Sequence, residues 1–257
     1  MKQIDLNCDL GEAADAEQER LESLVFPYVT SVNVACGQHA GNPGLMRRTV
    51  QRAKAHKVSI GAHPGLPDRE HKGRRDLGLP LAQIEALVIS QIETLAAIAA
   101  GEGERLTHVK PHGAMYGRAA RDPEFAEAFV QAVVAVDRQL AVVGLAGAHL
   151  TRVAREYGLA AAEEAFVDRA YEADGHLASR DLAGSVITDP GDVADRLERL
   201  VREGVIPSRT GTPVCPTPDT ICVHGDTPGA DRLLAVIRAT LERLGAAVVS
   251  CHAHPRD

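Results

Sequence analysis

The sequence predicts an α/β protein whose parallel strands close into a TIM-like (β/α) barrel of seven or eight strands. Apolar, strand-like segments alternate with helix-like segments along the chain, which is typical of parallel sheets with right-handed crossovers. The 257 residues, 45% of them hydrophobic, suit one such barrel, so we expect a single domain over residues 1–257. A dinucleotide-binding sheet is the competing fold, but neither G-x-G-x-x-G nor G-x-x-x-x-G-K-[ST] occurs.

The first half of the chain contains four predicted strands separated by three predicted helices. The strands cover residues 4–10, 31–37, 58–63 and the segment that starts at 107. The helices cover residues 17–24, 43–57 and 81–100. Asn42 is expected to cap the second helix, with Pro43 in its first turn. A long basic loop, residues 64–76, follows the third strand.

The second half continues the alternation. Strands are predicted at 140–145, 161–167, 185–188 and 220–226, of which 185–188 is short. Helices are predicted at 122–137, 149–157, 190–202 and from about 230 to 245. Asp122 and Asp189, each followed by Pro, are placed as helix caps. Residues 204–219, rich in Gly, Pro and Thr, are expected to form a loop.

Composition excludes several classes of protein. The net charge of −7, with no basic stripe, argues against nucleic-acid binding. No leader-like segment and no uninterrupted apolar run of membrane length occurs, so we expect a soluble, cytoplasmic protein. The five cysteines form no C-x-x-C pair, and Cys8, Cys36 and Cys222 lie within apolar strands, where they are expected to be reduced and buried.

Polar side chains gather where the predicted strands end. Alternate positions on a strand share a face, so the inward-facing groups are Asp5, Asn7 and Asp9 on the first strand, His108, Lys110 and His112 on the fourth, and His224 and Asp226 on the last. His39 and His63 each finish an apolar run just before a loop. Ligands bind outside the carboxyl ends of parallel strands, so these groups predict a site at the barrel mouth.

Each group also has a structural interpretation. A lysine in an apolar strand needs a partner, and Asp9 or Glu163 is expected to pair with Lys110, either for catalysis or as a structural ion pair. His112 and His224 are placed as general acids or bases. His39 and His63 serve catalysis or brace their loops. The loop cations Arg69, Lys72, Arg74 and Arg75 form a solvated loop or a phosphate clamp, and the Asp168–Arg169 pair is structural or binds substrate.

Six motifs, in order along nearly the whole chain, resemble the signatures of the LamB/YcsF family. They are DLNCDLGE at 5–12, NVACGQHAG at 33–41, GAHPG at 61–65, VKPHGA at 109–114, DRAY at 168–171 and CVHGDTPG at 222–229. The chain departs from the family pattern at Asn42, where the family usually has Asp, and at Gln38, where an aromatic residue is usual. Asn42 keeps the capping role but lacks a carboxylate.

The resemblance implies a deformed (β/α) barrel akin to the polysaccharide deacetylases. It also implies ATP-dependent opening of the lactam of 5-oxo-L-proline to L-glutamate, together with subunits B and C, with ATP as co-substrate, Mg²⁺ and no tightly bound organic cofactor. Catalytic roles are assigned to Asp9, Lys110, His112, His224 and Asp226. Binding of substrate or phosphate is assigned to Asp5, Asn7, Glu12, His39, His63, Arg74, Asp168 and Arg169.

Within that scheme, Lys110 and the loop arginines stabilise phosphate charge, and Asp9, His112 or His224 activates water or moves protons. Asp5, Asn7 and Glu12 orient the others or hold Mg²⁺. One alternative is a metal-dependent amidohydrolase or carbohydrate deacetylase with Zn²⁺ on Asp9, His39 and His63. Another is a non-catalytic subunit that binds a carbohydrate or another small ligand.

Overall fold

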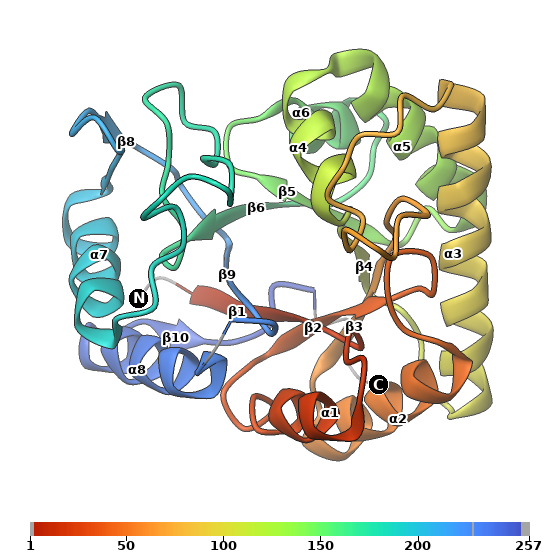
Figure 1. The fold of residues 1–257 in the computed structure, drawn as a ribbon, viewed down its shortest axis with the longest axis horizontal. Helices are drawn as coiled ribbons and strands as arrows, with labels where there is room; N and C mark the ends of the chain where they lie inside the picture. The colour runs from red at the N-terminus through yellow and green to blue at the C-terminus, as the bar shows by residue number, and fades with distance from the viewer. Residues whose placement is uncertain (1–2, 228, 253–257) are drawn as a thin grey trace.

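Seven parallel strands form a closed ring in the computed structural model, which describes residues 3–227 and 229–252 (Figure 1). The strands are β1 (Gln3–Leu10), β2 (Ser31–Ala35), β3 (Ser59–His63), β4 (His108–Val109), β5 (Ala141–Leu145), β6 (Ala161–Phe166) and β9 (Thr220–His224). They pair in that order, and β9 returns to β1 to close the barrel. The predicted barrel is therefore confirmed, with seven strands in the ring.

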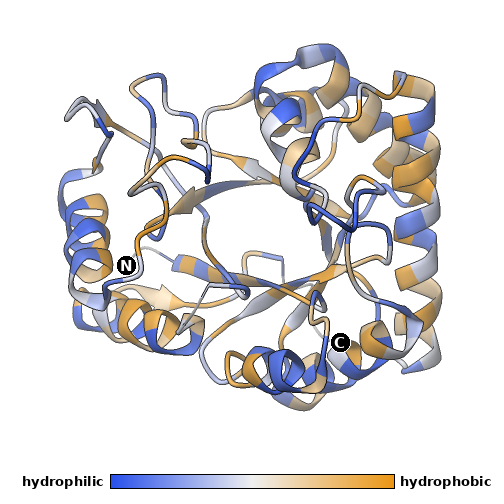
Figure 2. Cartoon of the chain, in the orientation of Figure 1, coloured by the Kyte–Doolittle hydropathy of each residue, from blue (hydrophilic) through white to orange (hydrophobic). Residues whose placement is uncertain are grey.

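Helices surround the ring (Figure 1). They are α1 (Ala16–Ser23), α2 (Pro43–His56), α3 (Leu81–Gly101), α4 (Gly113–Arg121), α5 (Pro123–Val136), α6 (His149–Glu156), α7 (Pro190–Glu203) and α8 (Ala230–Arg243). Hydrophobic and hydrophilic residues alternate along these helices, as expected when one face of each helix packs on a core (Figure 2). The hydrophobic core lies between the helices and the outward face of the strands, to which β1 contributes Ile4, Leu6 and Cys8.

The strand register sets the polar side chains of neighbouring strands side by side. Asp9 on β1 is paired with Asn33 on β2 and with His224 on β9. Gly61 on β3 is paired with His108 on β4. A Cβ atom at Gly61 would lie 2.1 Å from His108 Nε2, so only glycine leaves room for this inward-pointing imidazole.

Side-chain caps begin three of the helices where the sequence places them. The Asn42 side chain accepts a hydrogen bond from the Leu45 amide at 3.0 Å. Asp122 caps α5 and Asp189 caps α7 in the same way, each followed by Pro in the first turn. Asn42 thus keeps the capping role that the sequence assigns to it.

Two local predictions differ from the structure, and two elements of the structure were not predicted. Residues 185–188 form no barrel strand and make only an isolated bridge between Val186 and Arg169. Helix α4 follows β4 directly, although two glycines weaken its helical pattern. The predicted loop 204–219 contains a short hairpin of β7 (Ile206–Pro207) and β8 (Pro213–Val214). Beyond α8, β10 (Ala247–Val248) pairs with the start of β1. Segments of two residues are too short to show a periodic pattern.

Helix α3 is the one helix in residues 3–227 and 229–252 that reaches the length and composition of a membrane span, with a mean hydropathy of 1.5 over 18 residues. Its buried residues include Ile84, Val88, Ile92 and Leu95. Gln91 is also buried and bonds to both backbone groups of Gly65 at 3.0 Å. This is the packing of an outer helix of a closed barrel.

Candidate active site

The inside of the barrel is filled with polar side chains rather than with the branched apolar residues usual in such barrels. In the layer nearest the amino ends of the strands, the Asp5 carboxylate accepts hydrogen bonds from the hydroxyls of Thr30, Ser31 and Thr220 at 2.7, 2.8 and 2.5 Å. Asp5 is fully buried. Its hydrogen bonds are thus made inside the barrel, away from the mouth.

Two amides form the middle layer. Asn7 Nδ2 donates to Glu164 Oε1 at 2.9 Å and to Thr220 Oγ1 at 2.7 Å. Asn33 Nδ2 donates to Asn7 Oδ1 and to Asp9 Oδ1, both at 2.8 Å. His108 Nε2 lies 2.9 Å from Asn33 Oδ1, which can only accept, so Nε2 carries a proton. These bonds fix the orientation of both amides.

Lys110 lies in the upper layer between two carboxylates. Its Nζ is 2.9 Å from Asp9 Oδ1 and 2.9 Å from Glu164 Oε1, and it also contacts Cys222 Sγ at 3.1 Å. Burial by itself would lower the pKa of Lys110, but Asp9, Cys222 and Glu164 raise it well above its ordinary value. Burial likewise favours protonated Asp9, yet His63 and Lys110 hold the pKa of Asp9 well below its usual range. Lys110 is therefore a fixed ammonium ion and not a base.

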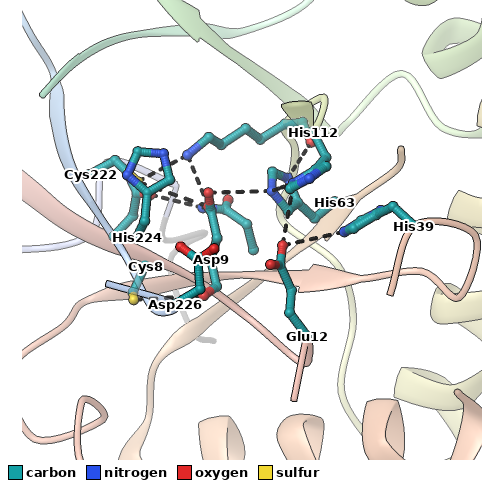
Figure 3. Close-up of polar contacts among 12 residues, drawn as sticks. Cys8, Asp9, Glu12, His39, His63, His112, Cys222, His224 and Asp226 are labelled. Atoms are coloured by element: carbon teal, nitrogen blue, oxygen red, sulfur yellow. Dashed lines mark hydrogen bonds and ion pairs between the residues drawn. The ribbon is translucent and has the colours of Figure 1, made fainter. Parts of the chain in front are cut away.

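Two histidines and two carboxylates meet above this layer (Figure 3). His63 Nε2 lies 3.0 Å from His112 Nδ1 and 3.4 Å from Asp9 Oδ2. Glu12 Oε1 lies 3.3 Å from His112 Nδ1 and 3.3 Å from His39 Nε2. The His39 ring stacks on the His112 ring with centroids 3.8 Å apart. Burial lowers the pKa of His112 well below its ordinary value even though Glu12 opposes this, so His112 is neutral at pH 7.

The loop that carries Glu12 is held by another carboxylate. Glu22 on α1 accepts hydrogen bonds from the backbone amides of Gly11 at 2.9 Å and Glu12 at 3.0 Å. Burial raises the pKa of Glu22 to about 7, although these amide bonds oppose the shift. Glu22 therefore positions Glu12 and changes charge near neutral pH.

A cavity of about 270 Å³ opens at the carboxyl ends of the strands. Asp9, His63, Lys110, His112 and His224 line its inner wall; Arg74, Arg121 and Arg180 line its outer part. The His224 ring is oriented by Asp168, whose Oδ2 is 3.1 Å from His224 Nδ1.

Cations outnumber carboxylates in the outer part of the cavity. Arg74 donates to Asp226 Oδ2, while Arg180 lies 3.6 Å from Asp226 Oδ1 and Lys72 lies 3.8 Å from Asp226 Oδ2. Three cations thus surround the single carboxylate of Asp226. On the inner wall, by contrast, the one ammonium ion of Lys110 lies between two carboxylates. The outer part favours an anion, and the inner wall does not.

Residues 168–188, here called the strap, cover one side of the cavity. Arg169 ties the strap together because its guanidinium donates to the carbonyls of Ser185 at 3.2 Å and Ala178 at 2.6 Å. Burial lowers the pKa of Arg169 to about 10, which still leaves it charged at pH 7. The strap contributes Leu177, Ala178 and Arg180 to the cavity wall.

The family model described as LamB/YcsF family matches residues 4–255. The chain belongs to the LamB/YcsF family. It is 50% identical over 248 residues to the A subunit of 5-oxoprolinase from Chloroflexus aggregans, covering 96% of this chain and 98% of that relative. It is 48% identical over 245 residues to the protein of the same name from Heliobacterium modesticaldum, covering 95% and 96%. The crystal structure of a lactam utilization protein from Thermus thermophilus superposes with a TM-score of 0.86 at 42% identity, covering 96% of this chain and 99% of that one.

Several groups predicted from the LamB/YcsF motifs come together at the cavity. Its wall includes Asp9, His63, Arg74, Lys110, His112, Arg169 and His224. Glu12 and His39 both contact His112. Asp168 contacts His224, and Asp226 contacts Arg74. Pro228, in the last motif, lies outside the described residues.

Three details of the predicted site are wrong. Glu164, not Glu163, pairs with Lys110, because Glu163 is one position away on the strand and points outward to Arg155. Asp5 and Asn7 are bonded inside the barrel and form no group with Glu12. At the barrel mouth, the three donors that lie within 4.8 Å of one another are Glu12, His63 and His112, not Asp9, His39 and His63.

Two of the four loop cations are structural. Arg69 donates to the carbonyls of Gly37 and Gly41, and Arg75 pairs with Asp68 at 2.9 Å. Arg74 and Lys72 instead lie at the rim of the cavity, where both side chains contact the Asp226 carboxylate. Sequence reasoning missed Arg180, which approaches the site only because the strap folds over the barrel, and no local pattern marks it.

Proposed function

We propose that this chain opens the lactam ring of 5-oxo-L-proline to give L-glutamate in an ATP-dependent reaction. The observation that carries the proposal is the division of charge in the cavity. The substrate's carboxylate binds Arg74 and Arg180 in the outer part, where cations are in excess. Its ring amide then lies against Asp9, His63 and His112 on the inner wall. The names of the relatives support the same substrate class.

A lactam carbonyl is a poor electrophile, and ATP converts its oxygen into a phosphorylated leaving group. Water adds to the activated carbon, the ring nitrogen leaves as the amine, and a second water releases phosphate from the γ-glutamyl phosphate. The balance is 5-oxoproline, ATP and two waters going to glutamate, ADP and phosphate. Asp9 Oδ2, the carboxylate oxygen that Lys110 does not hold, accepts a proton from the attacking water. His224, oriented by Asp168, delivers one to the ring nitrogen.

We place ATP on a partner protein. The cavity of about 270 Å³ suits a small lactam and is below the size usual for larger ligands. Mg²⁺ prefers oxygen ligands, but Asp226 is engaged by three cations and the inner cluster offers imidazole nitrogens, so these residues do not suit Mg²⁺. The metal therefore accompanies ATP. In this proposal the chain works in the cytoplasm with 5-oxoprolinase subunits B and C.

Glutamate release from 5-oxo-L-proline tests the proposal. The chain is mixed with its co-encoded B and C partners, with and without ATP and Mg²⁺. We expect glutamate only with all proteins and ATP present, and a KM for 5-oxoproline raised about tenfold or more in Arg74→Met, because a charge-assisted bond to the carboxylate is lost. Arg152→Met, which breaks an exposed pair with Glu156, is the matched control. No glutamate from folded, associated partners would overturn the proposal.

A further inference from the structure

Three acceptor atoms, from Glu12, His63 and His112, lie within 4.8 Å of one another between β1, β3 and β4, and an oxygen of Asp9 lies beside His63. His63 Nδ1 lies 2.8 Å from the carbonyl oxygen of Lys110, and His112 Nε2 lies 2.7 Å from that of Lys72. A carbonyl can only accept, so these two ring nitrogens carry the protons. The other nitrogens, His63 Nε2 and His112 Nδ1, then present lone pairs to each other at 3.0 Å.

Two carboxylate oxygens point at the same nitrogens. Glu12 Oε1 is 3.3 Å from His112 Nδ1, and Asp9 Oδ2 is 3.4 Å from His63 Nε2. Neutral imidazoles carry no hydrogen on His63 Nε2 or His112 Nδ1, so these lone pairs and the carboxylate oxygens repel one another. Either an extra proton or a metal cation between them removes the repulsion. Lys110 does not supply it, because its ammonium is bound to Asp9 Oδ1 and Glu164 Oε1.

The backbone contacts of both histidines match the second shell of metal sites. A histidine that binds a metal usually donates its other N–H to a carbonyl or carboxylate, which fixes its tautomer. Both His63 and His112 do so here. Glu12 is fixed as well, by the two amide bonds of its loop to Glu22.

We propose that Glu12, His63 and His112 bind one divalent transition metal, with Zn²⁺ as the best fit. Their ligand atoms lie within 4.8 Å of one another, and two imidazoles with one glutamate are a known zinc set that keeps a position open. His63 and His112 line the cavity, so the open position faces the ligand. The metal would polarise a carbonyl or activate water there. The assignment concerns binding alone and does not depend on lactam opening.

Metal binding to the purified full-length chain tests this proposal without any turnover. After chelator treatment, Zn²⁺ is titrated by calorimetry. We expect one tight site in the wild type, weakened about 100-fold or more in His112→Gln and Glu12→Gln, with circular dichroism confirming the fold. His71→Gln is the matched control, because His71 also lies 3.2 Å from a carboxylate but on an exposed loop. Added Zn²⁺ should raise the melting temperatures of the wild type and of His71→Gln, but not those of His112→Gln and Glu12→Gln.

Cobalt separates this site from a second group of donors. Asp5, Cys251 and His252 also lie within 4.8 Å of one another at the other end of the barrel. Bound Co²⁺ should show no sulfur-to-metal charge-transfer band if it lies on Glu12, His63 and His112. Such a band, lost in Cys251→Ser, would overturn the assignment. So would the absence of tight Zn²⁺ binding by the wild type, which would mean that a proton holds the cluster together.

Discussion

Replacing Lys110 with methionine should destabilise the barrel severely. The side chain is 2% exposed and its ammonium is 2.9 Å from each of two buried carboxylates, Asp9 and Glu164. Removing one partner of a buried pair leaves charge uncompensated at a cost of about 3–5 kcal/mol. For a chain of this length 1 kcal/mol shifts the melting temperature by roughly 2–4 °C, so Lys110→Met should lower it by roughly 6–20 °C.

The assay is thermal unfolding followed by circular dichroism at pH 7. The double variant Lys110→Met with Glu164→Gln should recover part of the loss, because it removes one of the two unpaired charges. The control Arg152→Met breaks a pair that is about half exposed and should change the free energy of unfolding by less than about 1 kcal/mol. A Lys110→Met melting temperature within about 2 °C of the wild type would refute the reasoning.

Three further changes follow from the same structure. Glu22 has a pKa of about 7 in the folded protein against an ordinary 4.5, so the free energy of unfolding falls as the pH rises from about 4.5 to 7. Between pH 4 and pH 8 the wild type should lose about 3 kcal/mol more than Glu22→Gln loses, measured by denaturant unfolding at both pH values. Gly61→Ala should displace the His108 ring and lower the free energy of unfolding by about 2–4 kcal/mol in denaturant titrations; an unchanged midpoint would contradict the packing. Arg169→Met should loosen the strap, because the carbonyls of Ser185 and Ala178 lose their buried donor, so that limited trypsin digestion within the strap becomes about tenfold faster; digestion at the wild-type rate would contradict this role.

The parts of the site that lie on strands were predictable from the sequence. A period of two places Asp9 on the inner face of β1, and the same rule places Lys110 and His112 with it although β4 itself spans two residues. The choice between Glu163 and Glu164 failed for a related reason. Adjacent acidic residues occupy opposite faces, and β6 is apolar on both faces elsewhere, so its pattern does not show which acid points inward.

Groups on loops were beyond the reach of periodicity. Glu12 reaches His112 because Glu22, ten residues further along, binds its backbone amide. Arg180 and Arg74 meet at Asp226 only because three distant loops close over the same end of the barrel. Such contacts depend on tertiary packing, which leaves no local pattern in the sequence.

The polar interior of the barrel determines which atoms remain available at its mouth. Asp9 Oδ1 receives hydrogen bonds from Asn33 at 2.8 Å and from Lys110 at 2.9 Å, so it is held inside the barrel. Asn33 can donate in that direction because His108 donates to its oxygen, which fixes the amide. Asp9 Oδ2 is consequently left facing His63 Nε2. A conventional apolar interior would pack as well but would leave both oxygens of Asp9 free to turn, so the polar layers contribute orientation at the reacting end.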